Sequence, residues 1–438
     1  VIAQCTYKMV LKKEMYKNSE QLLERALKSI PLASQTFSKS LTQYPKGVSP
    51  FFIEKGKGSK VWDVDGNEYI DFVNSLAAVT LGYCDADVDQ AVQEQMKNGV
   101  TFSLPHTLEI ELAEKLIDII PCAEKVRFAK NGTDATSAAI RIARAYTNKE
   151  HVAVCGYHGW QDWYIGSTTR DLGVPRVVKE LTHKFEYNNI ESLELVFQEQ
   201  DLACIIMEPM NIEYPEWNFL EKVKELAHKN NTLLIFDEIV TGFRVSLGGA
   251  QELFNVIPDL ATFGKGMANG YPLSAVVGSN EVMQKVEDIF FSGTFGGETL
   301  SLSAASAVID KYKKNNIIEH LNEVGTYLLG QLNKLINSNN LNDIFWTSGH
   351  PAWGFLHIKE QEKYNTFEIK TFFLQEVFKR GILTLGSHNL SFEHSKKDVD
   401  QLLRVYAEVL PIIGQHIKNQ TLLENIQGDI LEPLFKVR

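Results

Sequence analysis

Hydrophobic positions in residues 126–310 follow two alternating patterns. Short apolar runs bounded by charged or turn residues are typical of strands that are buried on both faces of a parallel sheet. Between these runs, apolar residues recur at helical spacing, as in the segment that begins at Thr133 and in residues 220–230. The alternation predicts an α/β fold in which helices cover a mostly parallel sheet. The expected strands are VRFAK (126–130), HVAVCG (151–156), PRVVKEL (175–181), LACIIMEP (202–209), TLLIFDE (232–238), LATF (260–263) and LSAVVG (273–278).

The residues before this sheet predict local structure of another kind. Apolar spacing predicts a helix over 18–30. Residues 51–72 predict a three-stranded antiparallel meander, with a hairpin turn at Asp65-Gly66. Residues 87–98 and 107–120 are expected to form helices that lead into the sheet.

After the sheet, helices and strands alternate again on a smaller scale. We therefore expect a small α+β domain that is built from both ends of the chain. The expected parts are an N-terminal tail or remnant (1–17), the first part of the small lobe (18–100), a large domain (101–315) and the second part of the small domain (316–438).

Composition excludes several classes of protein. The net charge of −11 argues against a general nucleic-acid or anionic-membrane surface. No apolar run approaches the roughly 20 residues that a membrane-spanning helix needs. The five cysteines are scattered and form no CxxC pair, which favours reduced thiols in a cytoplasmic protein and argues against a metal site. The chain starts at Val1 rather than Met, consistent with one part of a longer, bifunctional protein.

A carboxylate and a lysine end two of the expected strands. Asp237 and Glu238 follow LLIF directly, and Lys265 follows LATF between two glycines. In open α/β sheets, ligands bind at the carboxyl ends of the strands. A pyridoxal phosphate enzyme needs this pair, because the lysine forms a Schiff base and the acid keeps the pyridinium nitrogen protonated. Asp237 and Lys265 are therefore candidate catalytic residues.

A phosphate site is predicted at Lys130–Ala135, between a strand and a helix. Gly132 allows close approach of the backbone, Thr133 offers a hydroxyl, and the helix N-terminus offers free N–H groups. Taken alone, an ordinary helix cap is the favoured explanation of the same residues. A second glycine-rich stretch, Ser292–Glu298, also precedes a helix, and a plain flexible connection is its alternative explanation.

Two further strand ends carry polar or aromatic side chains. Tyr157 and His158 follow the strand HVAVCG, where an aromatic ring could stack on a flat cofactor, although packing alone also explains them. Glu208 follows LACIIM, where a strand-terminating turn residue is an equally good explanation. All these clusters fall at strand ends or helix starts of one sheet, and this agreement favours a shared site over unrelated caps and turns.

The sequence resembles the class III pyridoxal phosphate enzymes, the group of glutamate-1-semialdehyde 2,1-aminomutase and its aminotransferase relatives. The resemblance implies a transferase of fold type I, with a mostly parallel seven-stranded sheet, and a homodimer whose active sites lie at the subunit interface. The segments that carry it are VWDVDGNEYIDFVNS (61–75), RFAKNGTDATSAAIRIARAYT (127–147), GYHGW (156–160), LLIFDEIVTGFR (233–244), PDLATFGKGMANGYP (258–272) and SGTFGGETLSLSAA (292–305).

The resemblance also implies roles for individual residues. Lys265 would be the Schiff-base lysine and Asp237 the partner of the pyridinium nitrogen. Glu208 would support the site from behind, and Arg244 is expected to be structural rather than a substrate contact. The remaining cofactor contacts implied are Asn131, Gly132 and Thr133 at the phosphate, Tyr157 and His158 at the ring, and Thr294 at the phosphate of the neighbouring subunit.

Departures from the aminomutase pattern bear on the reaction. Lys39 stands where an arginine faces the substrate carboxylate, and a lysine cannot form the same bidentate contact. Leu76 replaces a tryptophan, Glu298 replaces an asparagine, and His388 lies in an altered C-terminal segment. A mutase must retain its intermediate whereas a transaminase must release its first product. Remodelled substrate positions therefore favour a transaminase, with the aminomutase as the alternative.

The substrates stay open at this point. L-Glutamate is the expected amino donor, and the acceptor is expected to be an aldehyde or ketone, such as a sugar or a small phosphorylated carbonyl compound. A catalytically silent relative is a third hypothesis, disfavoured because Lys265 and Asp237 are both present.

Overall fold

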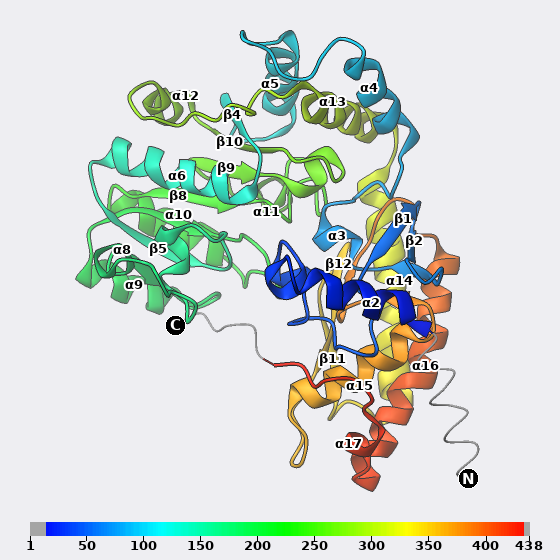
Figure 1. The fold of residues 1–438 in the computed structure, drawn as a ribbon. Coiled ribbons are helices and arrows are strands. Elements are labelled where there is room, and N and C mark those ends of the chain that lie inside the picture. The colour runs from blue at the N-terminus through cyan, green and yellow to red at the C-terminus, as the bar shows by residue number, and fades with distance from the viewer. Residues whose placement is uncertain (1–14, 433–438) are drawn as a thin grey trace. The chain divides into compact units, whose positions relative to one another are not determined.

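The computed structural model describes residues 15–432, so most of the expected tail lies outside the described residues. The chain forms two compact units. The large unit comprises Ala77–Leu81 and Asp85–His320, and the small unit comprises the described residues up to Leu76, Gly82–Cys84 and the described residues from Leu321 onward. Figure 1 traces both units along the chain.

The large unit contains a seven-stranded sheet with the strand order β4-β10-β9-β8-β7-β5-β6. Strand β10 is antiparallel to both of its neighbours, and all other pairings are parallel. The prediction of a mostly parallel seven-stranded sheet is confirmed. The strands are β4 (Lys125–Ala129), β5 (His151–Cys155), β6 (Thr182–Lys184), β7 (Leu202–Met207), β8 (Leu233–Asp237), β9 (Leu260–Phe263) and β10 (Ser274–Gly278).

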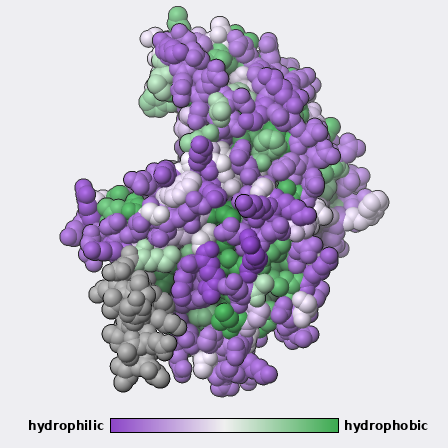
Figure 2. Space-filling view, turned by 90° about the vertical axis from the view of Figure 1, so that its right-hand side faces the viewer, coloured by the Kyte–Doolittle hydropathy of each residue, from purple (hydrophilic) through white to green (hydrophobic). Residues whose placement is uncertain are grey.

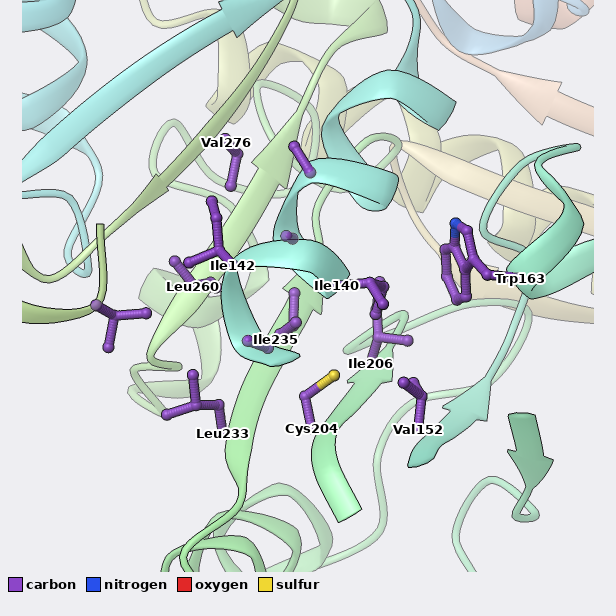
Figure 3. Packing of buried hydrophobic residues seen from close by; sticks show 14 of the residues in the cluster. Ile140, Ile142, Val152, Trp163, Cys204, Ile206, Leu233, Ile235, Leu260 and Val276 are labelled. Atoms are coloured by element: carbon purple, nitrogen blue, oxygen red, sulfur yellow. The ribbon is translucent and has the colours of Figure 1, made fainter. Parts of the chain in front are cut away.

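The core of this unit lies between the sheet and helix α6 (Gly132–Thr147), which packs on β10, β9 and β7. Figure 3 shows Ile140 and Ile142 of α6 above the strand residues Ile206 and Ile235. Residues of β7 and β8 are buried along the whole length of each strand, as their uninterrupted apolar runs predict. Complete burial of one such side chain contributes roughly 1.5–3 kcal/mol to stability.

One expected strand is wrong. Residues 175–181 form the short helix α8 (Arg176–Lys179) instead, and the strand β6 starts at Thr182. Pro175 explains the difference, because proline has its φ fixed at a helical value and is favoured at helix starts.

The other helices of the large unit surround this sheet. Helices α4 and α5 pack against α13, so residues 85–100 belong to the large unit rather than to the small lobe in which they were expected. The helices are α4 (Ala86–Met96), α5 (Thr107–Ile119), α7 (Asp162–Ile165), α9 (Ile190–Glu199), α10 (Phe219–Lys229), α11 (Ala250–Phe254), α12 (Asn280–Met283) and α13 (Thr299–Lys314), with 3-10 turns η3 (Lys265–Ala268) and η4 (Gln284–Glu287).

The small unit joins the two ends of the chain. The expected meander is present as β1 (Ile53–Lys57), β2 (Lys60–Asp63) and β3 (Glu68–Asp71), and β3 pairs in parallel with the C-terminal strand β13 (Ile382–Leu383). A second sheet has the order β11-β12-β14, with β11 (Phe345–His350), β12 (Trp353–Ile358) and β14 (Ser387–Asn389).

The remaining short and long helices complete the list of elements. They are α2 (Lys17–Ala26), η1 (Pro31–Ala33), η2 (Phe37–Lys39), α3 (Asn74–Ala77), α14 (Ile317–Ser338), α15 (Thr366–Phe378), α16 (Lys396–Asn419) and α17 (Leu422–Asn425). Element α3 is unusual because all four of its residues have φ values between 46° and 68°, in the left-handed region.

The sequence argued against a membrane-spanning helix, a metal site and a CxxC pair of cysteines, and residues 15–432 of the structure bear on all three. Within that range, no helix is long and apolar enough to cross a membrane, and no cluster of three or more potential metal ligands occurs. The cysteines at 84, 122, 155 and 204 are free thiols. Hydrophilic residues predominate on the face drawn in Figure 2.

Candidate active site

The carboxyl ends of four adjacent parallel strands bring the predicted catalytic side chains to one edge of the large unit. Asp237 ends β8, and Glu208 directly follows β7. Tyr157 and His158 lie just beyond β5, and Lys265 begins the turn after β9. Because β9, β8, β7 and β5 are neighbours in the sheet, residues that are more than a hundred positions apart in sequence converge there.

Asp237 and His158 form a buried pair. The Nδ1 of His158 lies 2.8 Å from Oδ2 of Asp237, and its Nε2 lies 3.1 Å from the carbonyl oxygen of Cys155. The other oxygen of Asp237 accepts hydrogen bonds from the Ile239 N–H and the Thr262 hydroxyl. These contacts fix the orientation of the carboxylate, so that it can serve as a preorganised partner for a cationic ring.

Lys265 is half-buried and has a left-handed backbone with φ of 43°. Burial lowers the pKa of its amine, and the nearby carboxylates of Glu208 and Asp237 oppose this effect. The following glycine is required by packing, because a Cβ at Gly266 would lie 2.5 Å from the Thr80 hydroxyl. An amine with a lowered pKa is available as a nucleophile and as a base.

The predicted anion cradle lies at the N-terminus of α6. Asn131 and Asp134 make a capping box, in which the Asn131 N–H donates to Asp134 Oδ2 at 2.8 Å. The Thr133 hydroxyl accepts a hydrogen bond from the Trp160 N–H at 3.3 Å. Gly159 is required there: it has φ of 108°, and a Cβ would lie 2.4 Å from Thr133 Oγ1. The cap and the cradle are therefore compatible explanations of the same residues.

Glu208 and Tyr157 lie next to each other at the site. The Tyr157 N–H donates to Glu208 Oε2 at 3.1 Å. The Tyr157 ring is half-exposed and meets Tyr164 edge-on, so one of its faces stays available to a ligand. Burial and the negative charge of Asp237 raise the pKa of Glu208 to about 7.

The loop at 292–298 lines a cavity of 940 Å³ in the large unit, together with residues of β4, α5 and α6. Thr294 is exposed on this loop and shares the cavity with Lys130 and Asp134, whereas Lys265 and Asp237 are not among the lining residues. The cavity is therefore distinct from the strand ends that carry Lys265 and Asp237, although it lies next to the start of α6.

Glu298 acts as a helix cap. Its carboxylate accepts hydrogen bonds from the backbone of Leu300 and Ser301 at the start of α13 and pairs with Lys130 at 2.9 Å. Burial alone would raise the pKa of Glu298, but the hydrogen bonds from Ser301 and Lys130 lower it below its usual value. These contacts occupy both oxygens of the carboxylate that was expected to face substrate.

Two of the expected substrate residues meet in the small unit. Lys39 and Leu76 line a cavity of 310 Å³, together with Tyr44, Asp71 and Tyr83. The Lys39 Nζ lies 3.5 Å from the Ser75 hydroxyl, which leaves most of its donor capacity available. The cavity thus combines the exposed cation of Lys39 and the buried carboxylate of Asp71 with largely aromatic and aliphatic walls.

His388, by contrast, has the surroundings of a core residue. It is completely buried, its Nε2 lies 2.8 Å from the Tyr406 hydroxyl, and Phe72 packs edge-on against its ring. Burial lowers the pKa of His388 to about 3. It does not line the cavity that holds Lys39 and Leu76. The expectation of a substrate contact overlooked the strand β14, which directs this side chain inward.

Sequence reasoning missed the role of one residue that supports the site and predicted that of another. Glu238 is completely buried and accepts hydrogen bonds from the Ala250 and Gln251 N–H groups, and so holds the loop after β8. Its position directly after Asp237 was the available signal. Arg244 is buried and donates to the Ala77 carbonyl and the Thr80 hydroxyl, as expected of a structural residue.

The arrangement fits a cofactor that has a cationic ring and a phosphate group. Asp237 offers an oriented carboxylate, and α6 offers N–H groups and the Thr133 hydroxyl. Lys265 offers an amine on the next strand end. This donor set is complementary to pyridoxal phosphate.

Comparison with known proteins identifies the family. The sequence model of the class III aminotransferases matches residues 43–392. A 3-aminobutyryl-CoA aminotransferase from Cloacimonas acidaminovorans is 35% identical over 404 residues, which are 90% of this chain and 96% of that protein. A glutamate-1-semialdehyde 2,1-aminomutase from Francisella philomiragia is 36% identical over 376 residues, or 80% of this chain and 85% of its own.

A solved structure supports the same conclusion. An omega-transaminase from Sphaerobacter thermophilus superposes with a TM-score of 0.82 at 26% identity, and the match covers 90% of this chain and 97% of that one. The chain belongs to the class III aminotransferases, and its cofactor is pyridoxal phosphate.

Proposed function

We propose that this protein is a transaminase that moves an amino group from an amino acid to an aldehyde or ketone by a ping-pong mechanism. The observation that carries the amino-transfer chemistry is the convergence of Lys265 with the Asp237–His158 pair at adjacent strand ends. Bound pyridoxal phosphate would supply an electron sink and a carrier for the amino group.

The residues of the chain would divide the remaining tasks. Asp237, held by His158 and Thr262, would keep the ring nitrogen protonated. Asn131, Gly132 and Thr133 would hold the phosphate. Tyr157 would lie against the ring. The amine of Lys265, whose pKa is lowered by burial, would move a proton at the substrate carbon.

Lys39 and Leu76 favour the transaminase over the aminomutase. A lysine ammonium binds an anionic group through a single point of charge and does not clamp a carboxylate as a guanidinium does. Leu76 and Lys39 border a cavity of 310 Å³. A transaminase must also release its first product, and a looser contact is compatible with that need.

L-Glutamate is the proposed amino donor. The proposed acceptor is a carbonyl compound with an anionic or strongly polar group, such as a phosphorylated carbonyl or a sugar, which Lys39 would bind. The name of the Cloacimonas relative indicates an acyl-CoA substrate, which carries phosphate groups. A phosphate-bearing carbonyl compound is one of the proposed anionic acceptors. The aminomutase is the second candidate, because several relatives carry that name.

We further propose a homodimer. The cavity beside Thr294 and the exposed ring of Phe295 on the same loop suit a surface that a second copy covers. In such a dimer, Thr294 would reach the phosphate held by the other copy. The molar mass in solution, measured by light scattering, tests the dimer; a monomer at working concentration contradicts it.

A half-reaction screen tests the reaction. The loaded enzyme is converted to its amino form with single amino acids and is then reoxidised with single carbonyl compounds, while the visible absorbance of the cofactor is followed. We expect conversion by glutamate and reoxidation by an anionic carbonyl compound. If only glutamate-1-semialdehyde reoxidises the enzyme, the protein is an aminomutase instead.

A variant tests the role of Lys265. Lys265→Ala should lose both turnover and the visible absorbance band of the cofactor, and a variant that retains both contradicts the role of Lys265. A wild-type protein that shows no cofactor band is a catalytically silent relative.

A further inference from the structure

The turn α3 carries part of the wall of the cavity that Lys39 lines in the small unit. Ser75 and Leu76 lie on this turn, and both line the same cavity of 310 Å³. The φ values of Asn74, Ser75 and Leu76 are 46°, 50° and 60°. A run of left-handed residues is unfavourable for side chains that have a Cβ, so contacts from outside the turn must hold it. The shape of the wall therefore depends on the residues that make these contacts.

Asp71, at the end of β3, holds the start of the turn. Its Oδ1 accepts hydrogen bonds from the N–H of Val73 at 2.7 Å and from the N–H of Asn74 at 2.9 Å. Its Oδ2 accepts a hydrogen bond from the Tyr83 hydroxyl at 2.6 Å. Both oxygens of this buried carboxylate are therefore engaged within the protein.

Asn389 holds the same segment from the C-terminal part of the chain. It ends strand β14 and lies 316 positions from Val73. Its backbone N–H donates to the Phe72 carbonyl at 2.8 Å, and its side-chain amide donates to the Val73 carbonyl at 2.7 Å. Its own carbonyl accepts a hydrogen bond from the side-chain amide of Asn74. Asn389 therefore binds three consecutive residues, the last of which begins the turn.

The amides of Asn74 and Asn389 are not fully satisfied by these contacts. The two residues are 0% and 4% exposed, and the amide oxygen of each has no hydrogen-bond partner within residues 15–432. Burial of such an oxygen without a partner is unfavourable. Two apolar side chains would avoid this penalty, but they could not donate to the Val73 and Asn389 carbonyls. The asparagine pair therefore serves the placement of the turn more than the stability of the fold.

The turn also contacts the cation of the cavity. The Lys39 Nζ lies 3.5 Å from the Ser75 hydroxyl oxygen. A displacement of the turn would move this hydroxyl together with the side chain of Leu76, and so would change both a polar and an apolar part of the wall. Asn389 is not among the residues that line the cavity, so it acts on the wall through the turn.

We propose that Asn389 is a positioning residue for the carbonyl acceptor: its hydrogen bonds, supported by those of Asp71, keep Ser75 and Leu76 in the cavity wall that the acceptor contacts. The inference rests on the proposed function, in which the acceptor binds beside Lys39. It makes the selectivity of the cavity depend on a C-terminal residue that does not touch the acceptor.

Steady-state kinetics of the cofactor-loaded enzyme test this role. The acceptor is glyceraldehyde 3-phosphate, or succinic semialdehyde if that compound reoxidises the amino form faster. Asn389→Ala removes the side-chain donor to the Val73 carbonyl. We expect KM for the acceptor to rise by about tenfold and kcat to change by less than about twofold, because the variant alters how the acceptor is bound and leaves the reacting groups in place.

Two comparisons separate positioning from a general loss of stability. Leu76→Ala removes the side chain that the turn presents, so adding Asn389→Ala to this variant should raise KM by less than about threefold. Asn425→Ala is the matched control. It removes a similar hydrogen bond of the small unit, from Asn425 Nδ2 to the Thr421 carbonyl at 2.8 Å, and should leave KM unchanged.

Asn74→Gly decides the matter if Asn389→Ala does not fold. Glycine adopts positive φ values freely, so this variant retains the backbone of the turn and loses the side-chain contact with the Asn389 carbonyl. We expect its KM for the acceptor to rise by about threefold, again with little change in kcat.

The outcomes separate this inference from the function on which it rests. An unchanged KM in Asn389→Ala, or in Asn74→Gly if only that variant folds, overturns the role of Asn389 and leaves the transaminase intact. An equal rise in Asn425→Ala, or the full rise in the Leu76→Ala background, overturns it too, since the effect then does not pass through the turn. A wild-type enzyme that neither carbonyl compound reoxidises refutes the proposed acceptor, and this inference with it.

Discussion

The Nδ1 of His158 lies 2.8 Å from Oδ2 of Asp237, and the two side chains are only 0% and 4% exposed. The contact ties the loop after β5 to the end of β8, two strands that are separated by β7. A buried hydrogen bond to a carboxylate is worth more than one at the surface, because water cannot replace it. The orientation of Asp237 therefore depends on a residue from another loop.

Replacing His158 should weaken cofactor binding. In His158→Asn, the carboxylate loses a hydrogen bond that contributes about 1.5–3 kcal/mol, so we expect the cofactor Kd to rise by at least about tenfold. Titration of the stripped protein with pyridoxal phosphate, followed by absorbance, measures it. His151→Asn is the matched control, because His151 instead contacts His183 at 2.9 Å. Equal Kd values for the two variants contradict the role given to His158.

Gly159→Ala should destabilise the protein and damage the phosphate cradle. The new Cβ would lie 2.4 Å from Thr133 Oγ1, and the backbone φ of 108° is unfavourable for alanine. We expect a loss of about 2–4 kcal/mol in the free energy of unfolding. Gly173→Ala separates the two causes, because Gly173 has a similar φ of 90° but nothing within 4 Å of its Cβ. Urea unfolding of both variants should show the larger loss at Gly159; equal losses would mean that backbone strain alone acts.

Lys39 should determine the affinity for the acceptor. Lys39→Ala removes the cation from the cavity of the small unit, so we expect KM for an anionic carbonyl acceptor to rise by about 10–100-fold. The cofactor absorbance should not change, because Lys39 is not proposed to touch the cofactor. Lys57→Ala, which removes an exposed lysine of β1, serves as the control. Unchanged KM in Lys39→Ala would place the acceptor elsewhere.

His388 should make stability depend on pH. Burial lowers its pKa to about 3, whereas an unfolded histidine has a pKa of about 6.5. A neutral buried histidine stabilises the fold above pH of about 6.5, and this contribution is lost as the pH falls towards 3. Between pH 7.5 and 5 the loss is about 2 kcal/mol. His388→Gln should show a smaller loss in urea unfolding, whereas His228→Gln, at an exposed position, should behave as the wild type. Equal slopes for all three proteins would contradict this assignment.

The sequence best predicted those site residues that directly end or follow a buried strand. The runs before Asp237 and Glu208 predicted buried strands with carboxylates at their ends, and both are present. The alternation of strands and helices predicted a mostly parallel sheet, but it did not predict the order of the strands within that sheet. The position of β7 between β8 and β5 depends on tertiary structure, and this position determines which loops lie side by side.

The sequence was least informative for polar residues whose partners are distant. Glu298 was expected to face substrate, but it caps α13 and pairs with Lys130, a residue 168 positions away. His388 was expected among the substrate positions, but it points into the core from a strand of three residues. The pairing of Glu298 with Lys130 and the burial of His388 are not visible in the local pattern, because they depend on which segments meet.

The four left-handed residues of α3 restrict how the cavity lined by Lys39 and Leu76 can be redesigned. Side chains that branch at Cβ are strongly disfavoured at positive φ, so valine, isoleucine and threonine at position 76 should cost more than their size suggests. Unbranched residues, asparagine and glycine remain compatible with that backbone. A mutant library at Leu76 is thus best restricted to such residues, and selectivity for bulkier substrates is more readily sought at Lys39.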